Sequence, residues 1–136
     1  TGTMRLYMDG VLKNFGQSSY PSYNYQRTPT GLTEITETLD EIYIGALSAA
    51  SSHFKGNIDD VAVFDAQLDD DAVAAMYNSG TPIDLTSNSG NYDNSNDLIG
   101  YWKFDEGTGT SIADSSSNSN AATLNNSPSW DNGDAP

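Results

Sequence analysis

The first regular alternation of apolar and polar residues lies near the N-terminal end of the chain. Apolar side chains alternate from Met4 to Met8, and Asp9-Gly10 separates them from a second apolar pair. Asp-Gly between two such segments is a strong hairpin signal, because a tight two-residue turn needs positive φ at both positions. The pattern predicts a β-hairpin over residues 3–15.

Two later segments also show strand patterns. Ile42 and Ile44 predict a short strand that ends at Gly45. The alternation resumes over residues 54–64 and gives the clearest strand pattern in the chain. Because side chains alternate between the two faces of a strand, this pattern places Asp59 on the same face as two valines.

One helix is predicted directly after this strand. Asp69 can cap its first turn, and the acidic residues that follow favour the positive end of the helix dipole. An apolar stripe then leads to Gly80, where the helix should stop. This composition is better explained by capping than by metal binding.

The remaining residues predict a connection and then one more strong strand. Residues 81–97 are rich in Pro, Ser, Asn and Asp, lack periodicity and are expected to form a linker. Aromatic residues announce a strand from Ile99 to Phe104, and a weak strand is expected over residues 121–124. The residues expected in the core are Met4, Leu6, Ile44, Val61, Val63, Trp102 and Phe104.

Composition narrows the possible functions. The chain of 136 residues is long enough for one domain with one core, and it has no cysteine, so disulfides and thiolate metal sites are excluded. Its net charge of −14 disfavours nucleic acids and anionic lipid surfaces. No run of apolar residues is long enough to predict membrane insertion.

Two stretches resemble a known family. The hairpin LYMDGVL, followed by IYIG and FKGNIDDVAVFDAQLDDDAVAAMYNSG, is similar to the C-terminal half of the laminin-G-like jelly roll of the concanavalin A-like superfamily. The stretch LIGYWKFDEGTGTSIADSSSNSNAATLNNSPSW resembles the opening strand of that family. The resemblance implies an all-β fold, an antiparallel two-sheet jelly-roll sandwich with one short helix.

The two stretches occur in the reverse of the family's order. Residues 1–80 correspond to the C-terminal half, residues 81–97 to the linker, and residues 98–136 to the segment that completes the same or an adjacent sandwich. The chain is expected to end a longer protein in permuted order. Two alternatives are a junction between tandem repeats and strands donated by a neighbouring subunit.

One loop has the spacing of a cation site. Asp114, Ser116, Asn118 and Asn120 place side-chain oxygens at every second residue, and such oxygens are the ligands that Ca²⁺ prefers. A merely polar surface loop is the alternative. Asp59 is expected to be partly buried, where it would need backbone donors or a cation. The laminin-G-like resemblance also implies frequent calcium binding at the loop, so structural Ca²⁺ is the predicted cofactor.

A second candidate site is a tyrosine-rich loop over residues 16–31. Tyr rings can stack on the apolar face of a sugar while neighbouring polar groups bind its hydroxyls. The alternative is that the rings pin the loop onto the fold. The predicted carbohydrate-binding residues are Tyr20, Tyr23, Asn24, Tyr25 and Arg27.

No catalytic site is predicted. His53 is the only histidine, and neither a nucleophile elbow nor a phosphate-binding glycine loop occurs. The glycosidase relatives carry a Glu-x-Asp-x-x-Glu strand, which residues 37–41 do not reproduce.

We therefore expect a non-catalytic extracellular binding or adhesion module. It would belong to a larger surface or virion protein, such as a tail fibre, or to a homo-oligomer, and bind a glycan or neighbouring protein subunits. The alternative is a purely structural repeat or cap of a filament that assembles through its sheet edges.

Overall fold

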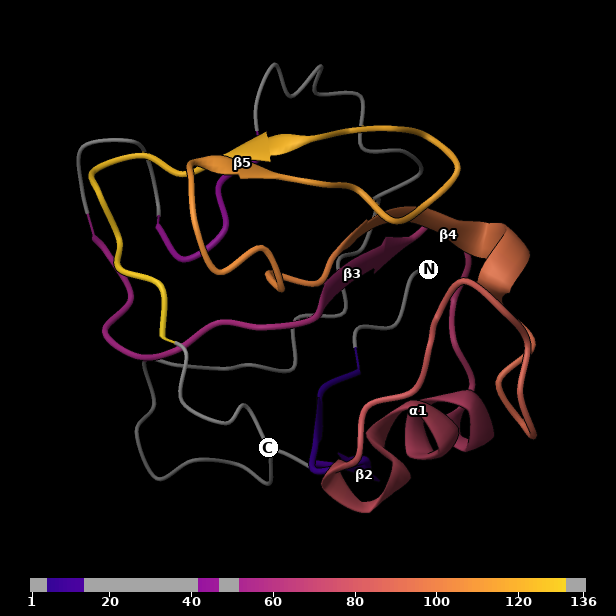
Figure 1. The fold of residues 1–136 in the computed structure, drawn as a ribbon. Coiled ribbons are helices and arrows are strands. Elements are labelled where there is room, and N and C mark those ends of the chain that lie inside the picture. The colour runs from indigo at the N-terminus through magenta and orange to yellow at the C-terminus, as the bar shows by residue number, and fades with distance from the viewer. Residues whose placement is uncertain (1–4, 14–41, 47–51, 132–136) are drawn as a thin grey trace, which may run out of the picture.

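The structure is a computed structural model that describes residues 5–13, 42–46 and 52–131. Within these residues the elements are three two-stranded antiparallel sheets and one α-helix, α1, with two short 3-10 turns, η1 (Asn78–Gly80) and η2 (Ser95–Asp97). In the view of Figure 1, the sheet of β3 and β4 lies between the β5 region above and α1 with β2 below. The described residues therefore match the coarse prediction of antiparallel β-structure with one short helix.

The N-terminal hairpin is confirmed. Strand β1 (Tyr7–Met8) pairs with β2 (Val11–Leu12), and the turn residues Asp9 and Gly10 have φ of 53° and 69°. The hairpin packs on the helix, since a Cβ at Gly10 would lie 2.8 Å from Cδ1 of Tyr77. Glycine at this position thus permits both the turn and the close approach of the ring.

The helix α1 (Asp70–Tyr77) also forms where the sequence predicts it. The Asp69 carboxylate accepts a hydrogen bond of 2.8 Å from the Ala72 amide, which satisfies one free N–H of the first turn. Asn78 ends the helix in the left-handed region, with φ 41°. The predicted capping role of Asp69 is confirmed.

The central sheet joins the two halves of the described chain. Strand β3 (Val61–Phe64) runs antiparallel to β4 (Leu98–Trp102), with Ala62 opposite Tyr101. This pairing connects the segment before α1 with the aromatic strand that lies after it in the sequence. The aromatic strand is therefore where it was predicted, within two residues.

Two strand predictions need correction. The strand predicted over residues 54–64 is reduced to β3, because Asp60 has φ 47° and interrupts the extended backbone. Residues 42–46 contain no strand, and Gly45 has φ 75°. A positive φ ends the alternation of side chains, so a pattern that continues in the sequence does not continue in space.

The third sheet was predicted only in part. Strand β5 (Ser111–Ile112) pairs with β6 (Ala122–Thr123), which confirms the weak strand near residue 122. Ile112 is completely buried. The chain between these two strands contains the predicted cation loop, so the short sheet fixes both ends of that loop.

The core differs from the predicted one. Trp102 is buried as predicted, whereas Leu6 is 46% exposed and was wrongly placed. Ile44, Val61, Val63 and Phe104 are only half-buried, and Met4 lies outside the described residues. The buried apolar side chains of the described residues are Ala72, Leu85, Tyr92, Leu98, Tyr101, Trp102 and Ile112.

Residues 81–97 contribute to this core, although they were expected to be a linker. Leu85 and Tyr92 cluster with Leu98 and Tyr101 of β4. The Tyr92 hydroxyl donates a hydrogen bond of 2.8 Å to the Leu85 carbonyl, so its polar end is satisfied inside the core. The segment is packed against the central sheet and is not a free spacer.

Candidate functional site

The predicted cation loop, residues 114–120, folds around the Asp114 carboxylate. Oδ1 accepts hydrogen bonds of 2.8 Å from the amides of Tyr101 and Ser116. Oδ2 accepts one of 2.9 Å from the Ser116 hydroxyl and one of 2.8 Å from the Asn120 amide. Each oxygen thus has two protein donors, which matches the number of sites that a carboxylate offers.

The same loop makes further hydrogen bonds with β4. The side-chain amides of Asn118 and Asn120 each donate to the Ile99 carbonyl, at 3.1 Å. The Ser115 amide donates to the Tyr101 carbonyl at 2.7 Å. The Trp102 indole N–H donates to the Asn120 carbonyl at 2.8 Å. The structure therefore brings four predicted site residues, Asp114, Ser116, Asn118 and Asn120, into one hydrogen-bonded unit.

This arrangement does not fit a calcium site. Ca²⁺ needs six to eight oxygen ligands, as a rule with several carboxylates, and here the one carboxylate of the loop is fully engaged by protein donors. Among residues 5–13, 42–46 and 52–131, no group of three or more His, Cys, Asp or Glu side chains is placed to hold a metal ion. Calcium binding at this loop stays a prediction of the sequence.

The expected burial of Asp59 is wrong. Asp59 is exposed and does not share a buried face with the valines of β3. Partial desolvation, and then the charges of Asp60 and Asp105, raise its pKa. Asp60 is the residue that reaches inward, because its Oδ1 accepts a hydrogen bond of 2.6 Å from the Tyr101 hydroxyl.

The Tyr101 ring therefore packs in the core, and its hydroxyl donates a hydrogen bond to Asp60. Burial first, and then the hydrogen bond to Asp60, raise the pKa of Tyr101 far above its usual value. The raised pKa favours the protonated phenol, which is the form that donates to Asp60. It links β4 to Asp60, the residue directly before β3.

The hydrogen bonds of Asp114 make its ionised form the favoured one. Burial raises its pKa, but the bonds from Tyr101, Asn120 and Ser116 together outweigh burial and lower the pKa below its usual value. The stabilisation that these hydrogen bonds give the folded state is present above the pKa that Asp114 has in the unfolded chain. It is lost as the pH falls through the pKa that Asp114 has in the folded chain.

An NMR titration of the Asp114 carboxyl carbon checks the lowered pKa, and a pKa at or above that of an unstructured Asp would contradict it.

The other acidic and aromatic candidates have different outcomes. Asp97 accepts a hydrogen bond of 2.8 Å from the Asn94 side chain and so closes the local turn. The carbohydrate-binding candidates, Tyr20, Tyr23, Asn24, Tyr25 and Arg27, lie outside the described residues.

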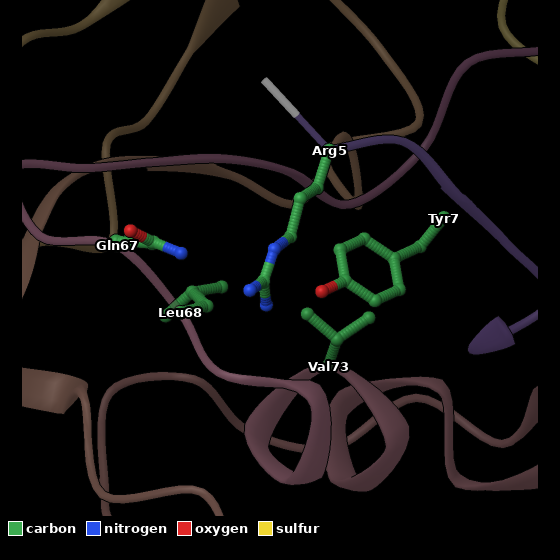
Figure 2. Close-up of a pocket in the computed structure, with 5 residues that line it drawn as sticks. All are labelled: Arg5, Tyr7, Gln67, Leu68 and Val73. Atoms are coloured by element: carbon green, nitrogen blue, oxygen red, sulfur yellow. The ribbon is translucent and has the colours of Figure 1, made fainter. Parts of the chain in front are cut away.

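A shallow pocket of about 240 Å³ lies between the hairpin and the start of α1. Arg5, Tyr7, Gln67, Leu68 and Val73 line it, and Figure 2 shows the Arg5 side chain reaching down between Leu68 and the Tyr7 ring. Arg5 donates to the Asp70 carboxylate at 3.0 Å, and the Tyr7 hydroxyl donates to the same oxygen. The Asp70 carboxylate thus balances the positive charge of Arg5 at the pocket.

Sequence reasoning missed two carboxylates that organise this region. Asp60 binds the Tyr101 hydroxyl, and Glu106 accepts a hydrogen bond of 2.8 Å from the Ala113 amide just before the loop. Neither carboxylate belongs to a sequence motif, because Asp60 binds a residue distant in sequence and Glu106 binds only a backbone amide.

Comparison of the chain with family models, curated proteins and solved structures finds no match.

Proposed function

We propose that this chain is a non-catalytic binding module of an extracellular or virion protein, built on a laminin-G-like β-sandwich and directed at glycans. The observation that carries the proposal is the antiparallel pairing of β3 with β4 around a shared core. These strands come from the two sequence stretches that resemble the family. Their pairing supports one sandwich assembled from both stretches in permuted order.

The described residues also support a non-catalytic role. His53, the only histidine of the chain, is exposed. The Asp114 carboxylate is engaged by four protein donors. Recognition would then rest on residues 16–31, where Tyr residues are neighbours in sequence of Asn, Gln and Arg.

A glycan array on the isolated chain tests the proposal. The expected result is saturable binding to one saccharide class. When Tyr23 and Tyr25 are both changed to Ser, the affinity should fall at least about tenfold, because two stacking surfaces are lost. Phe54→Ser is the matched control, since Phe54 is 61% exposed and lies outside that loop. Circular dichroism confirms that each variant keeps its fold.

The array also separates the proposal from its structural alternative, a filament repeat or cap. That alternative has its own support, because the hairpin exposes Met8 and Val11 by 55% and 57%. A structural unit should bind no saccharide and should self-associate as its concentration rises, which light scattering detects. No saccharide binding together with self-association would replace the glycan proposal.

A further inference from the structure

Strand β4 has two edges, and β3 covers only one of them. In an antiparallel pair, successive residues direct their N–H and C=O groups to opposite edges of the strand. Tyr101 directs both its N–H and its C=O to the 114–120 loop, and Ile99 directs its C=O there. This edge of β4 therefore faces the loop, and the opposite edge faces β3.

The loop meets this edge as a paired strand would. The Tyr101 N–H finds an acceptor in Asp114, and the Tyr101 C=O finds a donor in the Ser115 amide. Two side-chain amides, from Asn118 and Asn120, fill both lone pairs of the Ile99 C=O. Side chains thus replace several of the backbone groups that a neighbouring strand would supply.

We infer that the 114–120 loop is an edge cap that stands in for a strand beside β4, and that Asp114 holds it there as a hydrogen-bond acceptor without a bound cation. An uncovered strand edge is a site for pairing with other chains. The cap closes this edge, so any strand that adds to the central sheet must add beside β3. The alternation of oxygens along the loop is then explained by hydrogen bonding to β4.

The cap is also fixed at its far end. The Asn120 carbonyl accepts the Trp102 indole N–H, while the Asn120 amide donates to Asp114. Trp102 is 7% exposed, so the loop is tied to a buried ring as well as to the strand backbone. These contacts come from the chain itself, which is why the inference requires no metal ion.

Hydrogen exchange on the full chain tests the inference. In buffer with EDTA, the Tyr101 and Asn120 amides should exchange at least about a hundredfold more slowly than in an unstructured chain, because both donate to Asp114. Asp114→Ala should abolish this protection and lower the melting temperature by roughly 10 °C. Asp93→Asn is the matched control for the loss of one acidic charge and should change neither.

A milder variant covers the case in which Asp114→Ala does not fold. The Asn oxygen in Asp114→Asn can still accept from Tyr101 and Ser116, while its NH₂ group faces the Asn120 N–H. The Tyr101 amide should therefore stay protected and the Asn120 amide should exchange faster. Unchanged exchange at both amides in this variant would overturn the edge cap.

Calcium distinguishes the inference from a metal site. In about 150 mM NaCl, which screens non-specific cation binding, millimolar CaCl₂ should leave the melting temperature and the Tyr101 exchange rate unchanged. Protection that appears only with calcium, and that Asp114→Ala removes, would show that the loop is a cation site. Glycan binding is measured independently, so neither result depends on the function proposed above.

Discussion

Replacement of Trp102 by Ala is expected to lower the free energy of unfolding by about 3–5 kcal/mol, the range for large aromatic side chains removed from a core. Trp102 is 7% exposed, and its ring covers Gly100 so closely that a Cβ there would lie 2.6 Å from ring atom Cη2. The substitution leaves a cavity beside β4 and removes the hydrogen bond that ties the ring to Asn120. Chemical denaturation measures the loss.

A second substitution separates the two roles of this residue. Trp102→Phe keeps an aromatic ring over Gly100 but loses the indole N–H, so we expect a smaller loss, of about 1–2 kcal/mol. Exchange at the Asn120 amide should speed up in both variants, because the loop loses its anchor at that end. A loss below about 1 kcal/mol for Trp102→Ala would show that the ring is not part of the core.

Replacement of Tyr92 by Ala is expected to have an effect of similar size, about 3–5 kcal/mol. Tyr92 is fully buried, and its ring makes an edge-to-face contact with Phe64 at a centroid distance of 6.3 Å. The ring therefore joins residues 81–97 to β3. Thermal unfolding should show a decrease in melting temperature of roughly 10–20 °C.

The matched variant Tyr92→Phe tests the polar end of the same side chain. It keeps the ring but leaves the Leu85 carbonyl without its donor, which costs about 1–2 kcal/mol. If residues 81–97 were a free linker, both variants would be as stable as the parent chain. That result would contradict the core described here.

The parts of the fold that could be predicted from the sequence are those with local causes. Asp9-Gly10 specifies its turn because both positions need positive φ, and Asp69 specifies the start of α1 because its carboxylate satisfies a free amide. The aromatic residues of β4 predict a buried strand, because large aromatic rings are usually buried in a core. Each of these signals acts within a few residues of the chain.

The parts that could not be predicted depend on contacts between distant residues. Leu85 and Tyr92 are isolated apolar residues in a polar segment, so no periodicity shows that they are buried. The alternation predicted through Asp59 is wrong because Asp60 has a positive φ. Asp can adopt this conformation, but the presence of an Asp in the sequence does not indicate it. A strand pattern can therefore predict which side chains alternate, but not the residue at which the strand begins.

The candidate loop shows the same limit. The sequence selected Asp114, Ser116, Asn118 and Asn120 as a group, and the structure does bring them together. Oxygen-bearing side chains at every second residue suit a cation, but the same carboxylate and amide groups can instead bind the N–H and C=O groups of a strand. Only the position of β4 beside the loop distinguishes the two arrangements.

NMR can detect the pairing of β3 with β4 around one shared core. The backbone groups of Tyr101 point away from β3, so Ala62 and Tyr101 form a non-hydrogen-bonded pair, in which the Cα atoms are about 4.5 Å apart. We therefore expect a strong nuclear Overhauser effect between the Hα protons of Ala62 and Tyr101. The absence of this effect in the folded chain would contradict the pairing and the proposals that depend on it.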